Sequence, residues 1–189
     1  MPAFKFNPIA MRSGFLIFYL LALVCFGSFA SPLKRATPAD IETLINRLTD
    51  EANAAASDLA DFPATGGSLT QALAIHSALT TLNSDLESGV TTLVATATGL
   101  SEADGVVVVD EANNGLTPAL LDIYTGINNF PDETLPIGGI GALLRSDGNK
   151  LQSDSTAFYN ALKALLPSDL EGSLRFPNPP IVQPGDPNS

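Results

Sequence analysis

Apolar residues recur at steps of three and four positions through most of the chain beyond residue 36. In a first stretch this stripe runs from Ile41 to Phe62, and in a second stretch it runs from Ile75 to Ala97. A step that averages about 3.6 residues places such side chains on one face of a helix. The two stretches therefore predict two long amphipathic helices, the second closed by Gly99.

Both predicted helices begin at a recognisable N-terminal signal. Thr37 precedes a proline and stands three residues before Asp40, and Ser68 stands three residues before Gln71. In a capping box, these two side chains satisfy each other's free backbone N–H groups at the start of a helix. A proline fits the first helical position, where its missing N–H costs nothing. The sequence thus predicts helix starts directly after Thr37 and Ser68.

A third stripe follows Ser101 and continues to Ile127, with two features that complicate it. The run Val106–Val109 is β-branched and would also suit a strand. Gly115 and Pro118 predict a kink, since proline removes a helical hydrogen bond. The stripe keeps one register through both features, and this continuity favours a helix.

A fourth stripe shares one helical register from Ile137 to Leu165, but glycines interrupt its first half. Residues Leu151–Leu166 predict a helix, whereas Ile137–Arg145 suit either a helix or a mobile loop. The segment Pro136–Gly148 is a candidate lid. Four main stripes with short connections predict an all-α fold, namely an up-and-down antiparallel helical bundle of four to five helices.

The N-terminal segment has the pattern of a secretory leader. An apolar run from Phe15 to Phe29 follows two basic residues and ends at small residues before a cleavage point at Ala30. Residues 1–30 therefore predict a signal peptide, with an uncleaved anchor as the alternative. Residues 31–35 form a short propeptide that ends at the dibasic pair Lys34 and Arg35. A secreted, extracellular protein follows from this layout.

The mature chain is expected to comprise a helical bundle domain over residues 36–175 and a disordered proline-rich tail over 176–189. No apolar C-terminal segment follows the tail, so no membrane anchor is expected in the mature form. Maturation removes four of the nine basic residues and none of the 20 acidic ones, which shifts the net charge from −11 to −15. Such a charge argues against nucleic acid as a partner.

Few residues offer catalytic or metal-binding chemistry. Cys25 is the only cysteine and lies in the leader, so the mature chain has no disulfide and no thiolate ligand. His76 is the only histidine, and no G-x-S-x-G motif accompanies it. We expect a histidine at the border of a helix face; a hydrolase built around His76 is the alternative. Accordingly, no catalytic residue, metal or cofactor is expected, and the chain is not predicted to be an enzyme.

The strongest signal of function is a resemblance that spans residues 37–174. It rests on the opening Asp40-Ile41-x-x-Leu44-Ile45-x-x-Leu48-Thr49, on long helices rich in Ala, Ser and Thr, and on the segment Leu116-Thr117-Pro118-Ala119-Leu120. With these features the chain resembles the fungal family of hydrophobic surface-binding protein A and the cell-wall galactomannoproteins. The resemblance implies a secreted, all-helical, non-enzymatic protein that adsorbs to hydrophobic surfaces and helps to recruit hydrolases such as an esterase or cutinase.

The related galactomannoproteins further imply a central apolar cavity that holds fatty acids. The apolar stripes of the predicted helices are compatible with either of two interiors: a solid core, or a hollow bundle whose cavity they line. If the bundle is hollow, its lining comes from inward positions of the second, third and fourth stripes: Leu79, Leu82, Leu86, Leu93, Leu120, Ile123, Ile127, Phe158 and Leu162. The alternative function is that of a structural cell-wall or effector protein that binds no lipid and acts through its acidic surface.

Overall fold

The computed structural model describes residues 36–65, 67–95, 99–130, 139–177, 179 and 181. The chain divides into two compact units, residues 1–34 and 35–189, and all of the helices described here belong to the second. The predicted signal peptide and the processing residues Ala30, Lys34 and Arg35 lie outside the described residues.

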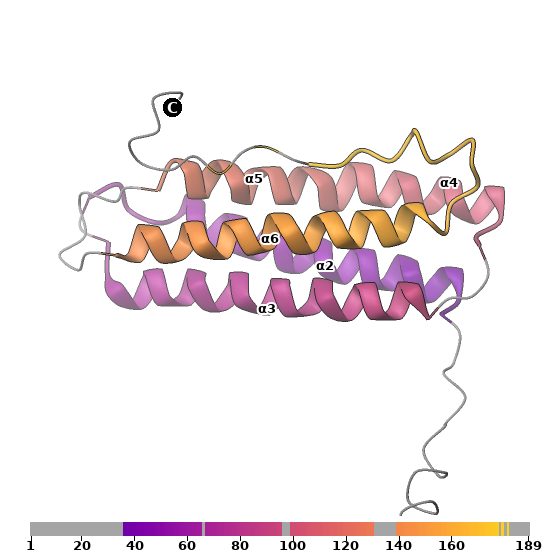
Figure 1. Ribbon diagram of the computed structural model, residues 1–189. Helices are drawn as coiled ribbons and strands as arrows, with labels where there is room; N and C mark the ends of the chain where they lie inside the picture. Colours follow the sequence, from indigo (N-terminus) through magenta and orange to yellow (C-terminus); the bar gives the residue numbers. More distant parts are fainter. Residues whose placement is uncertain are drawn as a thin grey trace, which may run out of the picture. The chain divides into compact units, whose positions relative to one another are not determined.

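The described residues form helices and contain no strand, which confirms the all-α prediction. In chain order the elements are α2 (Pro38–Ala60), α3 (Leu69–Val94), α4 (Glu102–Glu111), the π-helical turn η1 (Ala112–Leu116), α5 (Thr117–Asn128) and α6 (Ile140–Lys163). Because α4, η1 and α5 follow one another without a break, they act as a single rod. Figure 1 shows the resulting four rods side by side.

The direction of the chain alternates from rod to rod, as the up-and-down prediction requires. The spatial order differs from the order along the sequence, however. α3 packs against α2 and α6, while the α4–α5 rod packs against α2 and α6. α3 and the α4–α5 rod therefore lie diagonally opposite each other in the bundle. As a result, two of the four neighbouring pairs, α2 with α5 and α3 with α6, run parallel.

Both predicted capping boxes are present. The backbone N–H of Asp40 donates to Thr37 Oγ1 at 3.2 Å, and the N–H of Thr37 donates to Asp40 Oδ2 at 2.8 Å. The N–H of Gln71 donates to Ser68 Oγ at 3.2 Å, and Gln71 Oε1 accepts from the N–H of Ser68 at 3.0 Å. These reciprocal bonds satisfy donors that each first turn would leave free. The helix of Ser68 ends at Val94, earlier than the expected closure by Gly99.

In the third rod, the structure shows how the valine run and the predicted kink are accommodated. The valine run Val106–Val109 is helical, with Val108 buried against the core. The predicted kink takes the form of the π-turn η1, in which the N–H of Thr117 donates to the carbonyl of Ala112. Since Pro118 has no N–H, the wider turn lets the rod continue past it without losing register.

The start of α6 settles the alternative between helix and loop for residues 140–145, which are helical. Gly139 precedes the helix with φ of +99°, in the left-handed region that glycine adopts without strain. The candidate lid therefore has its second half, Ile140–Gly148, inside a regular helix. Its first residues lie outside the described part of the chain.

Helix α6 comes close to its two neighbours at glycines. A Cβ atom on Gly89 of α3 would lie 2.9 Å from the ring of Phe158, and one on Gly148 would lie 2.9 Å from Ile127 Cδ1. Since real carbon contacts are rarely so short, both positions require the absence of a side chain. The glycines thus set how closely α6 approaches α3 and α5.

Candidate functional site

The nine predicted lining residues are all fully buried in one continuous core. Leu79, Leu82, Leu86 and Leu93 come from α3, and Leu120, Ile123 and Ile127 come from α5, while Phe158 and Leu162 come from α6. The helices therefore bring these side chains together on the inside of the bundle. Whether they separate to line a ligand cavity stays a prediction.

Two pairs of buried hydroxyl groups lie between α5 and α6 inside this apolar core. The Tyr124 hydroxyl is 2.9 Å from Ser155 Oγ, and Ser155 Oγ also donates to the carbonyl of Gln152 at 3.2 Å. The Tyr159 hydroxyl is 2.7 Å from Thr117 Oγ1. One of these hydroxyls is visible as an exception in the sequence pattern, because Ser155 falls on an otherwise apolar stripe.

Burial changes the acidity of both tyrosines. Desolvation raises the pKa of Tyr124 to about 12, although the hydrogen bond with Ser155 opposes the shift. Desolvation likewise raises the pKa of Tyr159 to about 12, against the bond with Thr117. Both phenols are therefore neutral at physiological pH and can donate a hydrogen bond to an acceptor that reaches them.

A groove of about 620 Å³ lies on the outside of the parallel pair α2 and α5. Its walls mix small, apolar and polar side chains: Asn53, Ala56, Ser57, Leu59, Ala60, Phe62, Ala64, Asp122, Thr125, Gly126, Asn129 and Phe130. At its end the rings of Phe62 and Phe130 pack 4.6 Å apart. None of the nine predicted lining residues borders this groove.

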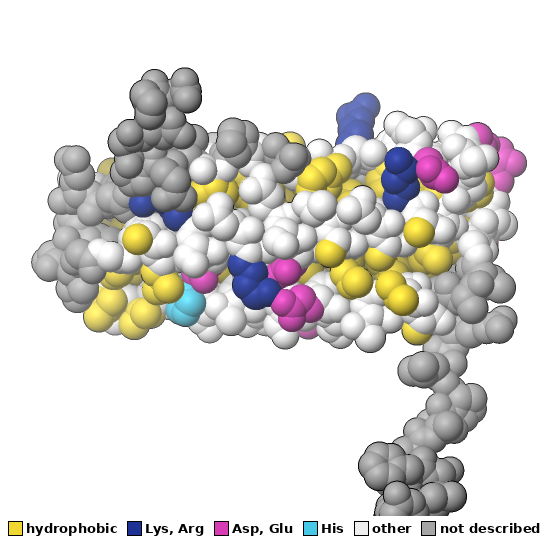
Figure 2. All heavy atoms as spheres, in the orientation of Figure 1, with side chains coloured by type: hydrophobic (Ala, Val, Ile, Leu, Met, Phe, Trp, Pro, Cys, Tyr) yellow, Lys and Arg dark blue, Asp and Glu magenta, His cyan; other side chains and the backbone are white. Residues whose placement is uncertain are grey.

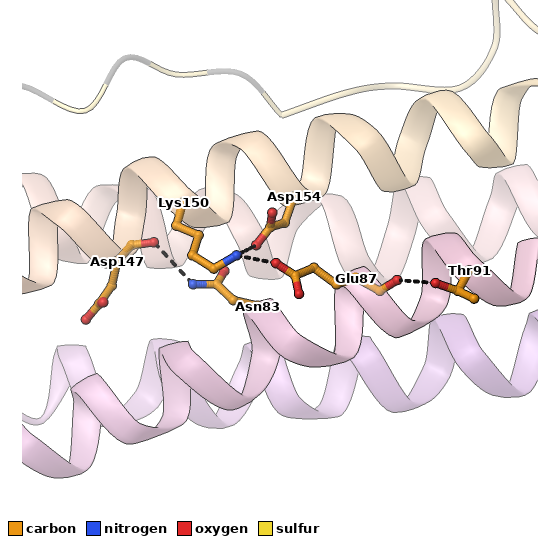
Figure 3. A network of polar contacts seen from close by, with 6 residues as sticks. All are labelled: Asn83, Glu87, Thr91, Asp147, Lys150 and Asp154. Carbon is orange, nitrogen blue, oxygen red and sulfur yellow. Dashed lines mark hydrogen bonds and ion pairs between the residues drawn. The ribbon is translucent and has the colours of Figure 1, made fainter. Parts of the chain in front are cut away.

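Polar contacts cross the seam between α3 and α6 (Figure 3). Lys150 pairs with Glu87 of α3 and with Asp154 Oδ2 of its own helix at 2.9 Å. Hydrogen bonds to Glu87 and then to Asp154 raise the pKa of the Lys150 ammonium group. One turn away, the side-chain amide of Asn83 donates to the carbonyl of Asp147 at 3.4 Å.

His76 also belongs to this seam, as the predicted histidine at the border of a helix face. Its Nδ1 is 2.6 Å from Asp147 Oδ2, and its side chain is 34% exposed. The pair joins the first third of α3 to the first third of α6. In the structure it therefore connects two parallel helices.

Several large exposed hydrophobic side chains lie together at one end of the bundle. Leu69 and Leu73 lie one turn apart at the start of α3, and Leu143 lies in the first turn of α6. Because His76 and Asp147 bring these two helix starts together, the three leucines form one end patch. Figure 2 shows hydrophobic side chains gathered beside the single histidine at this end.

Toward the other end of the bundle, three valines are exposed on separate rods. Val94 at the end of α3 is 72% exposed, and Val106 and Val107 of α4 are also exposed. Elsewhere on the bundle Leu121 is an exposed leucine on the side of α5. Water-exposed apolar patches such as the end patch typically mark interaction sites.

Among the described helices, none combines the length and the apolar character that crossing a bilayer requires. In the same part of the chain, no group of three or more His, Cys, Asp or Glu side chains is placed to hold a metal ion.

The comparisons with known proteins agree with this geometry. The family of hydrophobic surface binding protein A matches residues 38–164. No curated protein matches the chain. Among solved structures, the chain is similar to the crystal structure of AFMP4P in complex with palmitic acid, with a TM-score of 0.64 and 24% sequence identity over 73% of this chain and 87% of that chain. This likeness supports the bundle fold. Because the family match covers more than half of the sequence, the chain belongs to the hydrophobic surface binding protein A family.

Proposed function

We propose that this chain is a secreted, non-enzymatic protein that binds hydrophobic surfaces and fatty acids. The observation that carries the proposal is the patch of exposed leucines at the start of α3 and α6, on a bundle that belongs to this family. Adsorption at an end leaves the acidic sides of the bundle in water. Bringing a secreted esterase or cutinase to a hydrophobic substrate, and association with the cell wall, are part of the same proposal.

For the fatty acid, we propose a site inside the bundle. An acyl chain would lie among the buried residues of α3, α5 and α6, where each methylene removed from water contributes about 0.8 kcal/mol. The carboxylate would lie at the hydroxyl pair of Tyr124 and Ser155, since both groups can donate to it. The complex of AFMP4P with palmitic acid supports this reading, because that protein has a similar fold. Entry requires the core side chains to move apart.

The adsorption half is tested with polystyrene beads and the variant Leu69→Gln/Leu73→Gln/Leu143→Gln. The three leucines are 40%, 46% and 36% exposed, which together amounts to roughly one fully exposed leucine. Removing that apolar area costs about 2–4 kcal/mol of adsorption free energy, so the bead-bound fraction should fall by about twentyfold or more at low coverage.

The matched control is Leu121→Gln, which changes an exposed leucine outside the end patch. We expect it to adsorb like the unmodified protein. If the triple variant adsorbs as strongly as this control, the end patch at the start of α3 and α6 is not the adsorbing surface. If the unmodified protein itself stays in solution with the beads, the adsorption half of the proposal fails.

A further inference from the structure

The segment after α6 packs against the bundle instead of leaving it. We call its described residues, 173–177, 179 and 181, the C-terminal strap. In Figure 1 the chain turns back after α6 and runs along the α4–α5 rod. The strap includes part of the tail that the sequence predicts to be disordered; for the remaining residues of 176–189, disorder stays a prediction.

The strap is held by side chains from both rods that it lies against. On the third rod, Asn113 Nδ2 donates to the carbonyl of Ser173 at 2.8 Å, and Asn113 Oδ1 accepts from the N–H of Arg175 at 2.7 Å. Thr117 Oγ1 donates to the carbonyl of Arg175 at 3.1 Å. On α6, Gln152 Nε2 donates to the carbonyl of Pro179 at 3.1 Å. The strap therefore bridges the seam between α5 and α6.

Apolar strap residues close the same seam. The ring of Phe176 packs edge-on against Tyr159, with the ring centres 5.4 Å apart. Ile181 packs at Gly148, where an added Cβ would lie 3.3 Å from its Cδ1. Directly beneath the strap, Thr117 bonds to both the Arg175 carbonyl and Tyr159. The hydroxyl pairs of the core thus begin immediately under this segment.

Direct contacts between helices join the rods of the bundle, including α5 and α6, where Ile127 packs on Gly148 beneath the strap. α3 and α6 are joined by ion pairs and by the close approach of Phe158 to Gly89. α2 and α5 are joined where Leu59 packs on Gly126. The described strap residues instead have no helical structure. The Ser173 N–H donates to the carbonyl of Leu170, and the strap's backbone bonds to the two rods run to the side chains of Asn113, Thr117 and Gln152. Segments held in this way open at a lower free energy than packed helices.

We propose that the C-terminal strap is a displaceable lid over the α5–α6 seam, and that an acyl chain enters the bundle when the strap lifts. This inference rests on the proposed function, because it assigns the entrance of the proposed fatty-acid site. Five of the nine predicted lining residues belong to α5 and α6, the helices that flank this entrance. Opening here would expose the Thr117 and Tyr159 hydroxyls first and the Tyr124–Ser155 pair behind them.

The test uses the variant Asn113→Cys/Ser173→Cys of the full chain. The only natural cysteine, Cys25, lies in the predicted leader, and Cys25→Ser in the same background removes this competing thiol. Oxidation ties the strap to the third rod, and reduction leaves it without its Asn113 anchor. Stopped-flow mixing with a fluorescent fatty acid then gives the association rate for both forms. The unmodified protein under the same oxidant and reductant is the control.

We expect the oxidised form to take up the fatty acid at least tenfold more slowly than its reduced form. The association rate of the reduced form should exceed that of the unmodified protein by at least about fivefold, since Asn113→Cys removes two hydrogen bonds to the strap and so raises the open population. Phe176→Ala tests the same point without cysteines and should also accelerate uptake.

Three outcomes are distinguishable. Faster uptake in the reduced form and in Phe176→Ala supports the lid. Equal association rates in all forms, with binding retained, overturn the lid and leave the fatty-acid site intact. No binding by the unmodified protein at saturating fatty acid overturns the fatty-acid site and the lid with it.

Discussion

The hydroxyl pair of Tyr124 and Ser155 gives the sharpest test of the interior. Both side chains are completely buried, and their oxygens are 2.9 Å apart. Ser155→Ala leaves the Tyr124 hydroxyl without this partner, which costs about 1–3 kcal/mol of unfolding free energy. Tyr124→Phe should cost less, about 0.5–1.5 kcal/mol, because Ser155 keeps its bond to the Gln152 carbonyl at 3.2 Å.

The double variant Tyr124→Phe/Ser155→Ala shows whether the two hydroxyls interact or contribute independently to stability. With both hydroxyls removed, no polar atom of the pair is left unsatisfied. The double variant should therefore lose about as much unfolding free energy as Tyr124→Phe alone. The coupling energy of the cycle then equals the loss caused by Ser155→Ala, about 1–3 kcal/mol. For the 154 residues that the predicted processing would leave, each kilocalorie per mole corresponds to roughly 2–4 °C in Tm.

The assay is urea unfolding of the four proteins followed by circular dichroism. The control cycle combines Ser155→Ala with Thr37→Ala, which removes the cap at the start of α2 and shares no partner with Ser155. That combination should be additive, with about 1 kcal/mol lost at the cap. If the Tyr124 and Ser155 losses are also additive, the two hydroxyls do not interact in the folded protein and the polar centre of the proposed site is refuted.

Two further predictions concern packing and alkaline pH. Gly89→Ala should destabilise the bundle by about 1 kcal/mol or more in urea unfolding, because crowding against Phe158 outweighs the gain in helix propensity. Gly172→Ala, with open space around it, should be neutral. Equal stabilities of the two variants would contradict the close approach of α3 and α6 at Gly89. Since the pKa values of Tyr124 and Tyr159 are raised from 10 to about 12, their contribution to stability should be complete below pH 10 and lost as the pH rises through 12. Tyrosinate absorbance of the folded mature protein should therefore appear only near pH 12, and a midpoint near pH 10 would show that these phenols are exposed.

Local signals along the sequence were sufficient to predict most of the helices. Thr37 with Asp40 and Ser68 with Gln71 mark two helix starts that the structure confirms, because a capping box involves only residues three positions apart. The apolar stripes also predicted that the nine proposed lining residues face inward, and all nine are buried. The chain's family was visible in the same pattern.

Features that depend on distant residues were not predictable in this way. The diagonal placement of α3 and the α4–α5 rod is a choice among packings that bury the same stripes. The strap depends on Asn113 and Gln152, whose partners lie about 60 and 27 residues further along the chain. Its prolines and Asn178 resemble a disordered tail in composition, yet Phe176 and Ile181 supply enough apolar contact to hold it. The groove along α2 and α5 likewise arises only when the two helices pack together.

The central claim is that this bundle accepts a fatty acid. The most direct measurement is native mass spectrometry of the purified protein after incubation with excess palmitate, with the Tyr124→Phe/Ser155→Ala variant alongside. The account predicts a species heavier by one palmitate for the unmodified protein and a clearly smaller share of that species for the variant. A spectrum that contains only the unliganded mass at saturating palmitate would contradict the claim.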